Sequence, residues 1–126
     1  MDISPFTISV SQDVLTDLKM RLGMARIPIN VDLPSEDEWE YGTPTGRVEE
    51  LVDCWKTMFN WRKMETTINV TLPQFTTLIN AGPLHRELKI HFVHRRSSNP
   101  TAVPLFFVHG WPGHFLELVN LLSSAI

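Results

Sequence analysis

The turn HGWPG, residues 109–113, is the stretch of this 126-residue sequence whose residue types and spacing could serve chemistry. It follows the apolar run 103–108 and precedes an amphipathic stretch, an order that predicts a strand, a tight turn and a helix. Gly110 carries no Cβ that would block a ligand, so the Trp111 N–H would be exposed at the carboxyl end of the strand. Pro112 fixes the backbone and is a candidate for a cis peptide bond. Such an N–H stabilises an oxyanion only beside a nucleophile, and a purely structural turn stays equally open.

The five histidines do not suggest a metal site. His91 and His94 are three positions apart in a predicted strand, so their side chains leave opposite faces. His85 lies in a predicted turn, and His109 and His114 have no carboxylate or thiol at ligand spacing. Phosphate-cradling glycine loops and a G-x-S-x-G nucleophile elbow are missing from the sequence as well. We therefore expect neither a metal nor a cofactor.

The acidic residues are not arranged for general acid–base catalysis. Four of them crowd a polar loop at residues 36–40, and Glu49, Glu50 and Asp53 lie on the polar side of a predicted helix. Acid–base work requires a carboxylate in an apolar pocket that raises its pKa. Nothing in the sequence singles out such a group.

Composition limits the partners and the compartment. Eleven Lys and Arg against 14 Asp and Glu give a net charge of −3, which offers no electrostatic basis for binding nucleic acid. The single cysteine, Cys54, excludes an internal disulfide and suits a reducing compartment. The N-terminus does not resemble a signal peptide, and no apolar run approaches the roughly 20 residues of a membrane span. We expect a cytoplasmic protein without a membrane span.

Helical spacing dominates the first 73 residues, after a short extended lead-in that the alternating Phe6, Ile8 and Val10 predict. Ser11 can cap a helix that ends near Gly23. Thr43 can cap a second helix, which has Pro44 in its first turn and a strong apolar stripe. Asn60 can cap a third, short helix. The sequence therefore predicts a helical arm over residues 1–73.

After Pro73 the apolar period changes from helical spacing to alternation. The stretches FTTLIN (75–80) and ELKIHFVH (87–94) predict two strands joined by a Gly-Pro turn. The run 103–108 has no polar alternation, which is typical of a strand buried on both faces. Such a strand needs pairing neighbours, and an unpaired apolar strand favours self-association. The expected fold class is α/β, with residues 74–126 forming the start of a core whose sheet is incomplete.

Several motifs in their order resemble one family. The turn HGWPG followed by FLEL, together with PFTISVSQDVLTDLKMRLGMARIP, WEYGTPTGRVEELVDCWKTMFNWR, LPQFTT and LKIHFVHRRS, is similar to the N-terminal region of microsomal-type epoxide hydrolases. The resemblance covers nearly the whole chain. It implies a mostly helical arm that leads into the opening strands of an α/β-hydrolase core.

The resemblance also implies roles for individual residues. Trp111 corresponds to the oxyanion-hole residue, which acts through its backbone N–H, and Pro112 to the proline expected to be cis. His109, Gly110 and Gly113 complete the motif. In the family an aspartate attacks the epoxide carbon and forms an ester, and a histidine with an acidic partner activates the water that hydrolyses it. Tyrosines from a lid protonate the epoxide oxygen.

None of those other groups is recognised in these 126 residues. None of the aspartates lies in a strand-to-helix elbow, and the only tyrosine, Tyr41, does not match a lid position. We expect the N-terminal part of an epoxide hydrolase-like protein, inactive as a truncated chain, with a small-molecule epoxide bound only in a complete enzyme. The alternative is a genuine short, non-catalytic interaction or regulatory module derived from the family. Whether the chain is itself an enzyme stays open.

The sequence departs from the family pattern directly after the turn. The family usually has a serine where His114 stands, and that serine forms a capping box with a glutamate three residues later, here Glu117. Loss of such a cap typically costs about 0.5–2 kcal/mol. A histidine side chain at this position could also crowd the oxyanion site.

Overall fold

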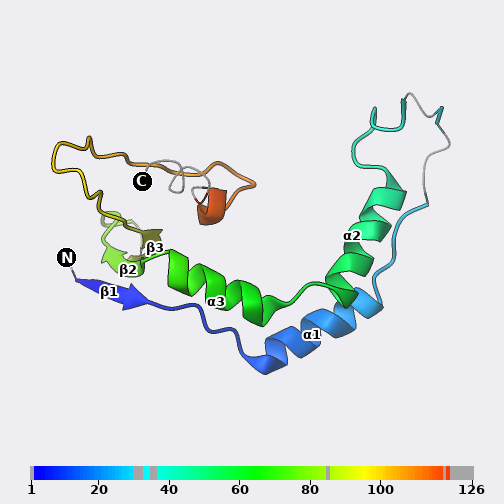
Figure 1. Cartoon of the computed structure of the whole chain (residues 1–126), viewed down its shortest axis with the longest axis horizontal. Coiled ribbons are helices and arrows are strands. Elements are labelled where there is room, and N and C mark those ends of the chain that lie inside the picture. Colours follow the sequence, from blue (N-terminus) through cyan, green and yellow to red (C-terminus); the bar gives the residue numbers. More distant parts are fainter. Residues whose placement is uncertain (1, 30–32, 35–36, 85, 118, 120–126) are drawn as a thin grey trace. The chain divides into compact units, whose positions relative to one another are not determined.

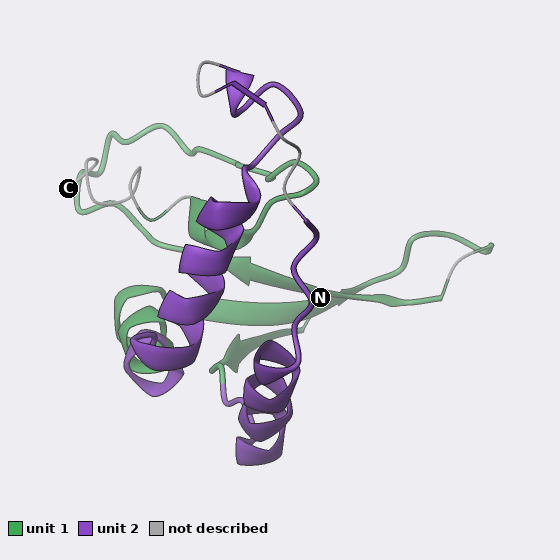
Figure 2. Cartoon of the chain, turned by 90° about the vertical axis from the view of Figure 1, so that its right-hand side faces the viewer, with its two compact units in different colours: residues 1–8, 65–126 green, residues 9–64 purple. Residues whose placement is uncertain are grey.

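The chain folds into two compact units. The structure, a computed structural model, describes residues 2–29, 33–34, 37–84, 86–117 and 119 (Figure 1). One unit comprises residues 9–64, and the other comprises residues 1–8 together with 65–126 (Figure 2). The unit that holds the sheet includes residues 1–8 of the chain and most of helix α3 (Trp61–Thr71). The expected boundary between arm and core at residue 73 therefore stays a prediction.

Helix α1 (Gln12–Gly23) begins at the predicted cap. The Ser11 Oγ accepts a hydrogen bond from the Val14 N–H at 3.4 Å, and Asp13 lies in the first turn, near the positive end of the helix dipole. Leu22, on the apolar stripe, is buried. The sequence therefore predicted both ends of this helix correctly.

Helix α2 (Thr45–Thr57) forms as expected but begins without a side-chain cap. The capping position is Pro44 rather than Thr43, and its carbonyl oxygen accepts hydrogen bonds from the N–H groups of Arg47 at 3.0 Å and Val48 at 3.2 Å. Proline suits this place because its fixed φ is close to that of a helix and it has no N–H to leave unpaired. The predicted Thr43 cap is therefore wrong.

Helix α3 carries the chain from the helical unit to the sheet. The Asn60 Oδ1 accepts a hydrogen bond from the Lys63 N–H at 3.0 Å, as its position before the helix predicts. Ile68 and the following Leu72 are buried, at 5% and 4% exposure. This burial fixes the second half of α3 and brings its Asn69 beside Gln74.

Three antiparallel strands form one sheet in the order β1-β2-β3. They are β1 (Ile3–Phe6), β2 (Gln74–Ile79) and β3 (Leu88–Val93). The two strands predicted after Pro73 are confirmed, whereas β1 was expected only as an extended lead-in. Residues that are paired across strands share a face, so the register places Phe6, Gln74 and His91 on the same face of the sheet.

The predicted strand at residues 103–108 is wrong. No strand is assigned to this stretch, and Val103, Leu105 and Phe106 are 89%, 80% and 89% exposed. A strand buried on both faces requires pairing partners on either side, and within the described residues no strand pairs with this one. The helix expected after the turn lies mostly outside the described residues, which show a 3-10 turn, η2, at Phe115–Glu117.

Candidate functional site

The turn at residues 109–113 contains one cis peptide bond and one sterically restricted glycine. The peptide bond between Trp111 and Pro112 is cis, as the sequence predicts. A Cβ on Gly113 would lie 2.6 Å from the Gly110 carbonyl oxygen and 2.6 Å from the Glu117 Oε1. Because the carbonyl belongs to the backbone, only glycine fits at position 113 without a shift of the turn. Gly110, by contrast, has open space where its Cβ would be.

The Trp111 N–H is an available donor at the tip of this turn. Trp111 is 96% exposed, and no hydrogen bond to its N–H is found in the part of the chain that the structure describes. The neighbouring His109 Nδ1 lies 2.9 Å from the Gly110 carbonyl oxygen, which can only accept, so Nδ1 carries the proton. The turn thus presents an exposed donor directly after the hydrogen bond between His109 and Gly110.

Glu117 ties the turn to η2 by half of a capping box. Its Oε1 accepts a hydrogen bond from the His114 N–H at 3.0 Å. In the reciprocal half a serine hydroxyl would accept from the Glu117 N–H, but that N–H donates to the His114 carbonyl oxygen at 3.1 Å. The sequence predicted the loss of the serine cap, and the structure shows that the glutamate keeps its role without it.

His91 is a residue of this region that sequence reasoning considered only as a metal ligand. Its ring lies 4.8 Å from that of Phe115, which directly follows the turn, and 5.0 Å from that of Phe6 in β1. The alternation in β3 placed His91 on a face, but no local signal in the sequence indicated these partners. Burial lowers the pKa of the His91 imidazole below its ordinary value.

The other candidate residues do not join the turn. Of the aspartates, Asp13 and Asp17 lie in α1 and Asp53 in α2, while Asp32 is outside the described residues. Within the described residues, no three His, Cys, Asp or Glu side chains gather closely enough to hold a metal ion. Across the same residues, no helix has the length and apolar character that a membrane crossing requires.

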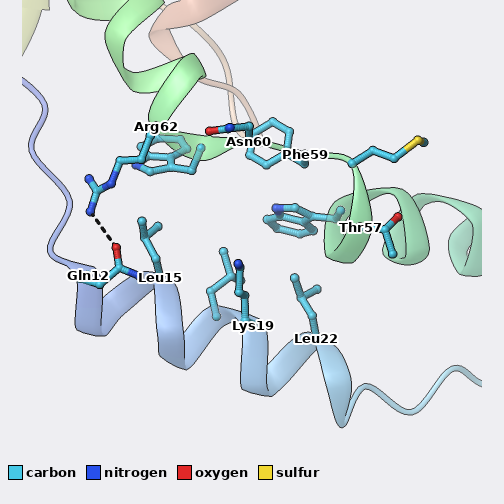
Figure 3. Close-up of a pocket in the computed structure, with 12 residues that line it drawn as sticks. Gln12, Leu15, Lys19, Leu22, Thr57, Phe59, Asn60 and Arg62 are labelled. Atoms are coloured by element: carbon cyan, nitrogen blue, oxygen red, sulfur yellow. Dashed lines mark hydrogen bonds between the residues drawn. The ribbon is translucent and has the colours of Figure 1, made fainter.

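A groove of about 320 Å³ lies within the unit of residues 9–64 (Figure 3). Figure 3 shows Leu15, Lys19 and Leu22 of α1 pointing toward the segment that joins α2 to α3. Arg62 lies at one end, where its Nη1 donates to the Val10 carbonyl oxygen at 2.7 Å and its Nη2 to the Gln12 Oε1 at 3.4 Å. The lining contains no carboxylate, cysteine or histidine, so it has no carboxylate or imidazole that could act as a base for a nucleophile. The groove is therefore a place where helices pack rather than a catalytic site.

The fold and the turn place the chain in the α/β-hydrolase class, as a helical arm followed by the first strands of the hydrolase core. The structure of the Aspergillus niger epoxide hydrolase matches 98% of this chain with a TM-score of 0.79 and 31% identity, over 30% of its own length. The family model described as epoxide hydrolase N terminus matches residues 3–118, and the chain belongs to that family.

Proteins with similar sequences support this assignment to the family. A putative epoxide hydrolase from Stigmatella aurantiaca is 39% identical over 97% of this chain and 26% of its own length. Juvenile hormone epoxide hydrolase 1 from Ctenocephalides felis is 35% identical over 97% of this chain and 25% of its own length. The chain therefore spans about a quarter of the curated relatives that it matches, and it corresponds to their N-terminal region. The predicted family and fold class are confirmed.

Proposed function

We propose that this chain supplies the oxyanion-stabilising turn of an epoxide hydrolase, with the Trp111 N–H as the donor. In the reaction proposed for the whole protein, an aspartate opens the epoxide and becomes an ester. Water then attacks the ester carbonyl, whose oxygen becomes negatively charged. A donor that is already fixed in place stabilises this charge without reorganising during the reaction.

The observation that carries this proposal is the exposed Trp111 N–H, which has no hydrogen-bond acceptor among the residues that the structure describes. Gly113 lets the backbone close on itself, and Glu117 fixes the following residue. His114 is exposed, so its side chain has room to lie away from the donor. Pro112 and His109 complete the support of the turn.

The remaining chemistry would come from groups outside these 126 residues. Among the residues that the structure describes, neither a nucleophilic aspartate in an elbow nor a histidine paired with an acid lies near the turn. We therefore propose that residues 1–126 by themselves do not hydrolyse epoxides. The substrate class we propose for the whole protein is a small-molecule epoxide, and the free thiol of Cys54 supports a reducing compartment such as the cytoplasm.

A chimera tests the proposal. Residues 1–126 would replace the matching N-terminal quarter of the Stigmatella relative, and diol formation from styrene oxide would be measured. We expect the chimera to be active and residues 1–126 alone to be inactive. Gly113→Ala should lower kcat by about 10²–10³, the usual loss for a displaced oxyanion donor.

Gly46→Ala is the matched control for this substitution. Gly46 lies in α2, and a Cβ there meets nothing within 4 Å, so alanine should leave diol formation unchanged. Equal rates for Gly113→Ala and the unsubstituted chimera would disprove the role of the turn. Diol formation by residues 1–126, free of host enzyme, would disprove the requirement for the missing groups.

A second candidate function is that of a non-catalytic interaction module. The exposed apolar stretch 103–108 favours it, because unpaired apolar backbone is suited to pairing with another chain. The partner that best fits is a second copy or a full-length relative with the same stretch. A chimera that is inactive while residues 1–126 form a defined dimer would favour this candidate over the first.

A further inference from the structure

We propose that His91 positions the HGWPG turn by holding Phe115 against the sheet in one ring orientation. The inference rests on the proposed function, since it names a residue outside the turn that determines where the Trp111 N–H lies. It concerns a positioning residue, because His91 reaches the turn only through Phe115.

The His91 ring lies between two aromatic rings from different elements. The Phe6 centroid in β1 is 5.0 Å away with an interplanar angle of 70°, and the Phe115 centroid in η2 is 4.8 Å away with an angle of 71°. Both are edge-to-face arrangements within the favourable range for aromatic pairs. His91 thereby joins β1, β3 and the segment that follows the turn.

A chain of hydrogen bonds fixes which nitrogen of His91 carries the proton. It starts at the backbone of Ile8, where the N–H donates to the Asn69 Oδ1 at 2.9 Å and the C=O accepts from the Asn69 Nδ2 at 2.8 Å. A backbone N–H can only donate and a carbonyl can only accept, so the orientation of the Asn69 amide is set. Its Oδ1 also accepts from the Gln74 Nε2 at 3.1 Å, which sets the Gln74 amide in turn.

The Gln74 Oε1 consequently faces His91. It lies 3.1 Å from the His91 Nε2, and because an amide oxygen only accepts, Nε2 must carry the proton. Gln74 is 4% exposed, so its oxygen has little water as an alternative partner. Burial also lowers the pKa of His91, with no charged group contributing to the shift. The neutral Nε2–H tautomer is therefore built into the sheet.

Phe115 links the His91 ring to the turn, because it lies two residues after Gly113. It is flanked by His114, whose N–H donates to the Glu117 Oε1 at 3.0 Å, and Glu117 returns its own N–H to the His114 carbonyl oxygen at 3.1 Å. At Gly113 a Cβ would lie 2.6 Å from the Gly110 carbonyl oxygen, so the backbone there has little room for a side chain. Because these contacts restrain the residues on both sides of Phe115, we expect a displacement of its ring to shift the turn and with it Trp111.

The tautomer is tested first, by the imidazole ¹⁵N shifts of the chain, recorded in solution or on a sedimented sample. We expect His91 to be protonated at Nε2 and not at Nδ1 at pH 7.5. Gln74→Met removes the acceptor and should leave a mixture of both tautomers at His91. Phe115→Leu keeps the acceptor and should leave the Nε2–H tautomer intact.

Coupling to the turn is tested by hydrogen exchange at the amides of His114 and Glu117, the two donors that hold η2 to the turn. His91→Phe keeps a ring but loses the Nε2–H, and Phe115→Leu loses the aromatic contact. Each should accelerate exchange at these amides about tenfold through local opening. His94→Phe is the matched control, since the His94 ring lies 6.5 Å from that of Phe75 at the end of β3, and it should change nothing at the turn.

Each outcome decides the proposal without reference to catalysis. An Nδ1–H tautomer in the unsubstituted chain, or unchanged exchange in both His91→Phe and Phe115→Leu, overturns it. A His91→Phe variant that exchanges rapidly in α1 as well has unfolded, and the decision then rests on Phe115→Leu and on the tautomer. Because neither readout requires diol formation, failure here is distinguishable from failure of the proposed function.

Discussion

Asn69 and Ile8 form a two-point hydrogen-bonded pair across 61 positions of sequence. The Asn69 Oδ1 accepts from the Ile8 N–H at 2.9 Å, and its Nδ2 donates to the Ile8 carbonyl oxygen at 2.8 Å. The side chain thus takes the place of a strand neighbour for the residue two positions after β1. Through this pair α3 and the end of the first strand are held together beside the sheet.

Replacing Asn69 should destabilise the sheet unit strongly. Asn69→Leu keeps a similar volume but leaves the Ile8 N–H, the Ile8 carbonyl oxygen and the Gln74 Nε2 without their partner. Each part-buried group that loses its bond costs about 1–3 kcal/mol, so the free energy of unfolding should fall by at least that amount. Urea unfolding followed by circular dichroism measures the change.

The control for this substitution is another asparagine with a single local bond. Asn80 accepts from the Gly82 N–H at 2.9 Å in an exposed turn. Asn80→Ala should change the free energy of unfolding by no more than about 0.5 kcal/mol. Equal effects of the two substitutions would show that the Asn69–Ile8 pair contributes no more than a surface turn.

Local patterns predicted the elements, whereas non-local partners could not be predicted. The caps at Ser11 and Asn60 act on amides three residues away, so the sequence reveals them directly. By contrast, β1 became a strand because it pairs with Gln74–Ile79, about 70 positions away, and four residues carry too weak a pattern to reveal this. The stretch 103–108 has the composition of a buried strand, but its state depends on partners that composition does not specify.

In the candidate site, too, local features could be predicted from the sequence and non-local contacts could not. HGWPG was found from its residue types, and the cis bond before Pro112 and the role of Glu117 at His114 were accessible to local reasoning. The contacts of His91 with Phe6 and Phe115 depend on strand register and on where the chain returns after the turn. No spacing rule in one sequence expresses such a relationship.

Restoring the serine after the turn should stabilise η2. His114→Ser provides a hydroxyl that can accept from the Glu117 N–H, which completes the capping box whose other half is already formed. We expect a gain of about 0.5–1 kcal/mol in the free energy of unfolding, measured with urea. The gain should disappear in the double variant His114→Ser/Glu117→Ala. A stabilisation that survives this second change would come from something other than the box.

The exposed apolar stretch should cause the chain to self-associate. Phe106 is 89% exposed, with Leu105 at 80% beside it, and such a surface favours association between chains. Phe106→Lys should shift the sedimentation profile toward monomer at micromolar concentration. Thr101→Lys adds the same charge at an exposed loop position and should leave association unchanged. If both variants remain associated to the same degree, the contact lies elsewhere on the chain.

Stability should fall as the pH falls below about 6.5, because of His91. Burial lowers the pKa of this imidazole in the folded chain below its ordinary value of 6.5, which the unfolded chain retains. Between the two values the unfolded state binds more protons than the folded state, so the free energy of unfolding decreases with decreasing pH. Well above pH 6.5 both states are neutral at this position and the contribution is constant. Urea unfolding from pH 8 to pH 5 measures this slope, and His91→Gln should reduce it. A slope that is the same in both proteins would place the titrating group outside the contact between the sheet and the turn.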